Sequence, residues 1–105
     1  LSDWSSDVCS SDLPFRVMET AYESMAVIKQ MVIEGNPNSV TDAGVGALCA
    51  RSAVIGACMN VRINATGYDD KVFVNDIVTR AKAIEAKAIA LEAEIVGLVN
   101  AKIGV

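Results

Sequence analysis

The 105-residue chain has no histidine, two prolines and few aromatic residues, which make up 5% of the sequence. Without histidine, the Cys–His and Ser–His–Asp catalytic sets are excluded, so acid–base chemistry has to use Asp, Glu, Lys or Tyr. The three cysteines, Cys9, Cys49 and Cys58, show no CxxC spacing. Together with the missing histidine, this spacing argues against a zinc site, and we expect no metal cofactor.

A basic face is also missing, because the formal net charge is −4. That charge argues against a nucleic-acid partner. The most apolar stretch, residues 43–59, is interrupted by Arg51 and rich in glycine, so we interpret it as a buried helix and expect no membrane span. Cys49 and Cys58 lie within this stretch and are expected to be small buried residues of a cytoplasmic protein.

Residues 1–13 read LSDWSSDVCSSDL, in which the string SSDV at residues 5–8 is nearly repeated as SSDL at residues 10–13. The segment has neither the basic nor the apolar region of a signal peptide, and it resembles a translated sequencing adapter. We therefore expect a non-native, disordered or artefactual leader. On this interpretation residues 14–105 are the C-terminal half of a larger helical domain, and the natural protein continues upstream. The leader holds three Asp and no Lys or Arg, so the acidic balance says little about partners.

The remaining sequence predicts an all-α fold of about three antiparallel, up-and-down helices, the last one long. The first is expected from Pro14 to Glu34, ended by Gly35. The second is expected from Ser39, in a capping box with Asp42, to about Ile63. Its many glycines and alanines indicate a close approach to its backbone. The apolar positions of the first helix follow a three-four spacing: Phe15, Met18, Tyr22, Met25, Ile28 and Val32.

The third helix is expected over residues 71–102, where a seven-residue repeat predicts a bundle or coiled-coil seam. The charged residues of this helix are expected to form a solvated face. Three helices of unequal length do not close a bundle alone, so we expect upstream helices or a second subunit to cover the exposed faces. The repeat positions are Ile77, Ile84, Leu91 and Leu98, with Ala81, Ala88 and Ile95, and the charges include Lys82, Glu85, Lys87, Glu92 and Glu94.

Two polar clusters are the candidate chemical groups. Residues 35–42 form a proline-containing turn that leads into a helix N-terminus, where N–H groups and the helix dipole favour negative charge. The plainer interpretation is an ordinary turn plus a cap. Residues 60–64 place two amides on one helix face, either as an interhelical hydrogen-bonded pair or as groups that recognise a heterocycle.

The strings GNPNSVTDAGVGAL at residues 35–48 and GACMNVRINA at residues 56–65 resemble the folate cyclodeaminase/cyclohydrolase family. That family includes formimidoyltetrahydrofolate cyclodeaminase, often fused to a formimidoyltransferase domain, and bacterial methenyltetrahydrofolate cyclohydrolase. The resemblance implies an all-α domain that forms homodimers, with the folate site near the subunit interface. The family domain is roughly twice as long as the matching residues. We therefore expect this chain to be inactive alone.

The resemblance implies a tetrahydrofolate derivative as substrate, and Asp42 as the acid–base residue, in competition with a role in helix capping or in compensating the helix dipole. Cyclisation of 5-formimidoyltetrahydrofolate with release of ammonia is the first choice, and hydrolysis of the methenyl compound is the alternative. A non-catalytic helical dimerisation module is the third; it predicts that Asn60→Ala and Asn64→Ala leave function intact. The expected substrate-binding residues are Asn36, Asn38, Ser39, Asn60, Arg62 and Asn64, and less firmly Arg51.

Overall fold

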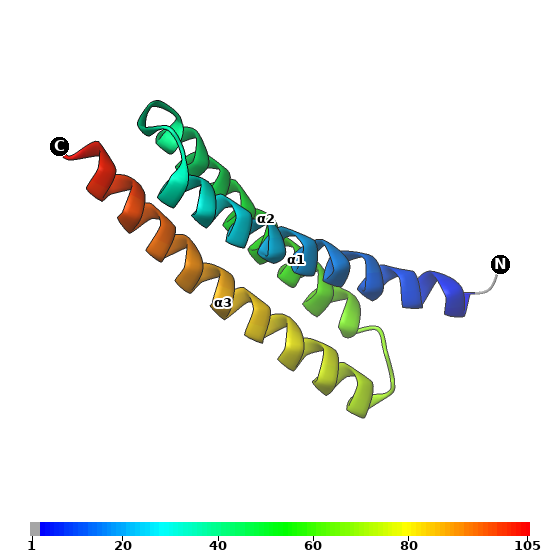
Figure 1. Cartoon of the computed structure of the whole chain (residues 1–105). Helices are drawn as coiled ribbons and strands as arrows, with labels where there is room; N and C mark the ends of the chain where they lie inside the picture. Colours follow the sequence, from blue (N-terminus) through cyan, green and yellow to red (C-terminus); the bar gives the residue numbers. More distant parts are fainter. Residues whose placement is uncertain (1–2) are drawn as a thin grey trace.

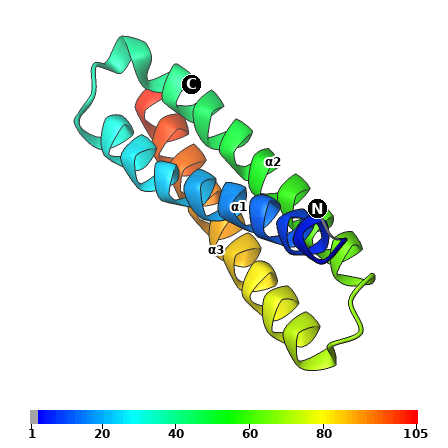
Figure 2. The same cartoon turned by 90° about the vertical axis from the view of Figure 1, so that its right-hand side faces the viewer.

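The computed structural model describes residues 3–105, with side chains described from Asp12 onward. In this part of the chain the elements are α1 (Asp3–Glu34), the 3-10 turn η1 (Pro37–Ser39), α2 (Val40–Ala65) and α3 (Lys71–Ile103). The three long helices run up, down and up in an elongated bundle (Figure 1, Figure 2) of 54 × 24 × 17 Å. The predicted all-α, antiparallel fold is confirmed, while dimerisation stays a prediction.

Helix α1 packs through the predicted apolar face. Phe15, Met18, Met25 and Val32 are buried, and the other two positions of the face are half-buried. The helix ends at Glu34, as the following glycine predicts. Its predicted start was wrong.

The helix begins at Asp3, and Pro14 lies inside it. A proline within a helix removes one backbone hydrogen bond but does not have to end the helix. Residues 1–2 and the side chains up to residue 11 lie outside the described residues. The proposed foreign origin of the leader therefore stays a prediction.

Helix α2 packs against both other helices, with the more extensive contact made to α1. Together with η1 it is the one described helix long and apolar enough to cross a membrane, a test that the core helix of a bundle also meets. The prediction that Cys49 is buried was wrong, because its side chain is exposed on the outer face of α2. Cys58 lies on the inner face and is buried, as predicted.

Helix α3 presents the predicted stripe to the core, and Ile77, Ala81, Ala88 and Ile95 are buried. The predicted solvated charged face was wrong at one position. Glu92 is only 7% exposed, because it lies one turn after Ala88 on the same buried stripe. Its carboxylate accepts a hydrogen bond of 2.8 Å from the guanidinium of Arg51 on α2. Arg51 therefore pairs within the bundle, which argues against the substrate role suggested for it.

One of the small residues of α2 marks a close helix–helix approach. A Cβ atom at Gly44 would lie 3.2 and 3.3 Å from the two Cγ atoms of Val99 on α3. At Gly56 a Cβ atom would meet nothing within 4 Å. The predicted close approach to the α2 backbone is therefore confirmed at Gly44 and is absent at Gly56.

Candidate functional site

The loop before α2 is built from local hydrogen bonds. The side-chain oxygen of Asn36 accepts a hydrogen bond of 2.9 Å from the backbone N–H of Asn38, and so caps η1. The backbone N–H and the hydroxyl of Ser39 both donate to the carbonyl of Asn36, at 2.9 and 3.0 Å. Asn36 and Ser39 therefore shape this turn, which supports the plainer interpretation for these two residues.

The predicted capping box between Ser39 and Asp42 was wrong. Ser39 makes no side-chain cap bond, because its hydroxyl is turned back toward Asn36. The backbone N–H of Ser39 is also used by Asn36, so it does not donate to Asp42. The Asp42 carboxylate is exposed in the first turn of α2, at the positive end of the helix dipole. The capping box is therefore absent, whereas the position of Asp42 in the first turn fits the other competing role, compensation of the helix dipole.

At the other end of α2, Asn60 is exposed and Asn64 is half-buried. Asn60 lies at the edge of a shallow groove of about 370 Å³ between α1 and α2. Its lining is otherwise apolar: Leu13, Pro14, Val17, Ala53 and Ala57. The backbone carbonyl of Asn64 accepts a hydrogen bond of 3.2 Å from Gly67 in the α2–α3 loop.

Arg62 does not converge with the two amides. Residues two apart on a helix point to nearly opposite sides, and Arg62 is exposed on the side of α2 that faces α3. Its charge acts on Cys58: burial and the carboxylate of Glu85 raise the pKa of the Cys58 thiol, whereas Arg62 lowers it. The guanidinium of Arg62 and the two amides therefore lie on different sides of α2.

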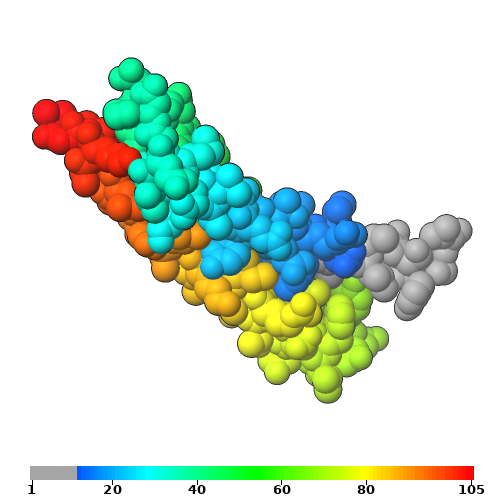
Figure 3. All heavy atoms as spheres, in the orientation of Figure 1, coloured from blue at the N-terminus to red at the C-terminus, as the bar shows by residue number. Residues whose placement is uncertain are grey.

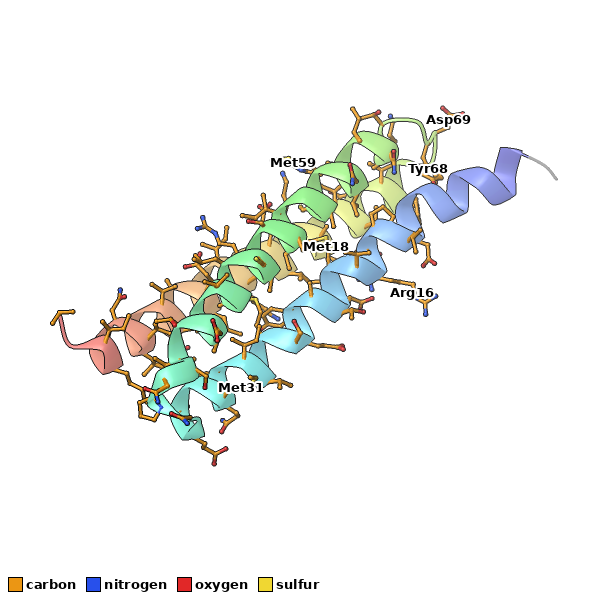
Figure 4. The ribbon with its side chains drawn as sticks, turned by 90° about the horizontal axis from the view of Figure 1, so that it is seen from above. Arg16, Met18, Met31, Met59, Tyr68 and Asp69 are labelled. Atoms are coloured by element: carbon orange, nitrogen blue, oxygen red, sulfur yellow. The ribbon has the colours of Figure 1, made fainter. Side chains whose placement is uncertain are left out.

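The two polar clusters lie at opposite ends of α2 and do not meet in one chain. Asp42 and Asn60 share a helix face, since eighteen residues complete five turns, but about 27 Å of helix separates them at ~1.5 Å per residue. Figure 4 shows the same separation, with Met31 at the end near η1 and Met59 with Tyr68 at the other. The groups predicted as one site are therefore two surfaces of a single chain.

The face of α1 and α2 turned away from α3 carries a second apolar stripe, which the sequence analysis missed. Leu13, Val17, Val27 and Met31 of α1 are 45–66% exposed. The four-residue spacing within each pair, Leu13 with Val17 and Val27 with Met31, was visible in the sequence, but the stronger stripe through Met18 and Met25 obscured it. The adjoining surface of α2 is also uncharged between Asp42 and Arg62 apart from Arg51, which faces α3. Both polar clusters therefore border an open apolar surface.

Comparison with known proteins decides the family. The family model described as formiminotransferase-cyclodeaminase matches residues 9–83. The chain belongs to this family. It is also 30% identical over 94 residues to the methenyltetrahydrofolate cyclohydrolase of Methylorubrum extorquens (strain AM1). That alignment covers 90% of this chain and 45% of the relative, so the chain spans about half the length of that protein.

Membership of this family confirms the resemblance carried by the strings at residues 35–48 and 56–65. The family match ends at residue 83 and thus includes both polar clusters. It begins at residue 9, inside the predicted leader, and does not test the leader's origin. A folate one-carbon enzyme family, with cyclodeaminase and cyclohydrolase chemistry, is the coarse functional assignment.

Proposed function

We propose that the protein acts on the one-carbon unit carried by the nitrogens N5 and N10 of a tetrahydrofolate. The observation that carries this proposal is family membership over most of the chain, together with a relative named for that chemistry. The chain covers 45% of that relative, so residues beyond those described here are part of the proposed enzyme. A fused formimidoyltransferase domain and a cytoplasmic location remain predictions.

Between the two activities, we now place methenyltetrahydrofolate cyclohydrolase first, because it is the name of the matched relative. In this reaction water adds to the methenyl carbon, a proton leaves the water, and one carbon–nitrogen bond opens. The cyclodeaminase is the second candidate, favoured by the description of the family. There N10 attacks the formimidoyl carbon, loses its proton, and ammonia leaves. Both reactions need a base that takes a proton during attack.

Asp42 is the proposed base. It is the only ionisable side chain in the string at residues 35–42, its carboxylate is exposed, and the capping box does not occupy it. Asn38, also exposed on the preceding turn, is the proposed hydrogen-bonding neighbour for the substrate. Asn36 and Ser39 contribute by shaping the turn.

We propose that the amide end of α2 contacts the substrate bound at Asp42 of a partner copy. Asn60 is too far from Asp42 to hold the same reacting atoms, since the two lie about 27 Å apart along α2. A homodimer that pairs the open faces of two antiparallel α2 helices would bring Asp42 of one protomer beside Asn60 of the other. The uncharged, apolar border of both clusters supports this arrangement.

The test uses the full-length protein expressed from its gene. One assay follows loss of the methenyl chromophore, and the other measures ammonia released from 5-formimidoyltetrahydrofolate. Methenyl hydrolysis without ammonia release is expected; ammonia release alone would reverse the order of the two candidates. Activity in neither assay, with a folded dimer, would favour the non-catalytic dimerisation module.

Asp42→Asn tests the assigned base. The expected loss of kcat is about a hundredfold, which is the usual contribution of a positioned general base. Asp69→Asn is the matched control, because Asp69 is also an exposed carboxylate and lies away from Asp42, in the α2–α3 loop. Equal kcat values for the two variants would remove Asp42 from the mechanism.

A further inference from the structure

The C-terminal end of α3 lies beside the turn between α1 and η1 (Figure 1, Figure 3). There the ammonium of Lys102 donates a hydrogen bond to the carbonyl of Val32 and another, of 3.0 Å, to the carbonyl of Ile33. Both carbonyls belong to the last turn of α1, where no intrahelical donor is available. A cation here also compensates the negative end of the helix dipole.

The same end of α3 holds the helix on the other side of the loop. Val99, one turn before Lys102, packs against Gly44 in the second turn of α2, at the closest helix approach described above. Helix α3 thus contacts both helices that residues 35–39 connect. One contact is a pair of hydrogen bonds and the other is tight apolar packing.

The loop itself has little freedom to absorb a shift of α1. The N–H of Gly35 donates to the carbonyl of Met31 at 2.8 Å, and a Cβ atom at Gly35 would collide with that carbonyl. Asn36 then bonds to both Asn38 and Ser39. A displacement of the last turn of α1 is therefore passed on to the residues that lead into Asp42.

We propose that Lys102 is a positioning residue for the candidate site. By holding the last turn of α1, its ammonium fixes the position of the loop that carries Asn38 and leads into Asp42 at the start of α2. The inference rests on the proposed function for its activity measurement. It goes beyond that function by assigning a role to a residue seventy positions from the carbonyl that it binds.

Lys29 provides a matched control. Its ammonium also joins α1 to α3, through an ion pair of 2.6 Å with Glu94. This pair links two side chains that are 32% and 52% exposed and does not touch the end of α1. Lys29→Met therefore removes a lysine and one α1–α3 contact without releasing the carbonyls beside the loop.

The experiment compares Lys102→Met, Lys102→Arg and Lys29→Met in the full-length protein. Exchange of the hydrogen-bonded amides of Gly35, Asn38 and Ser39 is expected to quicken at least tenfold in Lys102→Met and to stay unchanged in Lys29→Met. We expect kcat to fall about tenfold in Lys102→Met with KM changed less, since displaced groups lose catalytic geometry. Lys102→Arg, which can still donate to both carbonyls, is expected to restore most of kcat.

Equal kcat values for Lys102→Met and Lys29→Met would overturn the proposal, as would unchanged exchange at residues 35–39. A wild-type protein inactive toward both folates would remove the proposed function but leave the exchange measurement valid. In that case the exchange rates alone decide whether Lys102 holds the loop.

Discussion

The two ends of α2 carry similar polar residues, but they differ in the contacts that the rest of the chain makes with them. At the Asp42 end, two residues of α3 contact the two sides of the loop. Lys102 binds the end of α1, and Val99 packs against α2. At the Asn60 end, the amide borders a groove that is open to solvent. The cluster at the Asp42 end is therefore positioned by its own chain, whereas the cluster at the Asn60 end borders a groove that another segment or copy can cover.

The largest effect is expected at the close approach between Gly44 of α2 and Val99 of α3. Gly44→Leu would force a side chain against Val99, and overpacking of this kind costs about 3 kcal/mol of unfolding free energy. Gly56→Leu, on the open side of α2, is expected to change stability little, because nothing lies within 4 Å of its Cβ position. Urea unfolding of both variants measures the difference. Equal destabilisation would remove the contrast between the closely packed and open surfaces.

The next largest effect concerns the ion pair of Arg51 with Glu92, which joins α2 to α3 at a point between the two ends of α2. Arg51→Met would leave the buried Glu92 carboxylate without its cation, at a cost of about 2 kcal/mol. The double variant Arg51→Met/Glu92→Met is expected to recover most of this loss, since an apolar pair needs no partner charge. Thermal and urea unfolding provide the measurement. A double variant as unstable as Arg51→Met would show that the arginine contributes by packing alone.

A smaller effect compares the two ends directly through their asparagines. Asn36→Ala removes the cap of η1 and is expected to cost about 1 kcal/mol. Asn60→Ala removes an exposed amide at the open groove and is expected to leave the unfolding free energy almost unchanged. If Asn60→Ala proves the more destabilising substitution, the amide end is held more firmly than the geometry indicates.

The smallest expected effect is a pH dependence from Cys58. Burial, and then the nearby carboxylate of Glu85, raise the pKa of this thiol above its ordinary value of 9.0. The folded chain therefore favours the neutral thiol. Its stabilising contribution is complete below about pH 9 and is lost as pH rises through the raised pKa. Urea unfolding between pH 7 and pH 10 should show a decline that Cys58→Ala reduces and Cys49→Ala, at an exposed thiol, does not.

Local sequence signals predicted the helices well and their caps less well. The spacing of Met18, Met25 and Val32 identified the buried face of α1. The structure adds a cap that was not predicted, because Asp70 accepts a hydrogen bond from the N–H of Phe73 at the start of α3. The start of α2 was harder, because Ser39 satisfies the capping-box pattern but its hydroxyl has a nearer acceptor in the preceding turn. Competing local hydrogen bonds of similar strength cannot be ranked from residue order alone.

For the candidate site, too, some features were predictable from the sequence and others were not. The two strings alone indicated the family, which the family match confirms, and with it the polar residues at each end of α2. Their separation follows from the predicted helix over residues 39–63, which already places the two clusters at its opposite ends, and the structure confirms that one unbroken helix joins them. The burial of Glu92 was missed, because a glutamate is usually solvated unless a cation from another helix reaches it.

The sequence by itself determined that this chain is helical, where its apolar faces lie, and which folate family it resembles. These properties depend on periodicity and on contiguous strings, which are local. Only the tertiary structure decided that Lys102 reaches the end of α1, that Val99 packs on Gly44, and that the amide end of α2 remains open. Such contacts join residues far apart in the chain, so they follow from how the helices pack and not from any segment alone.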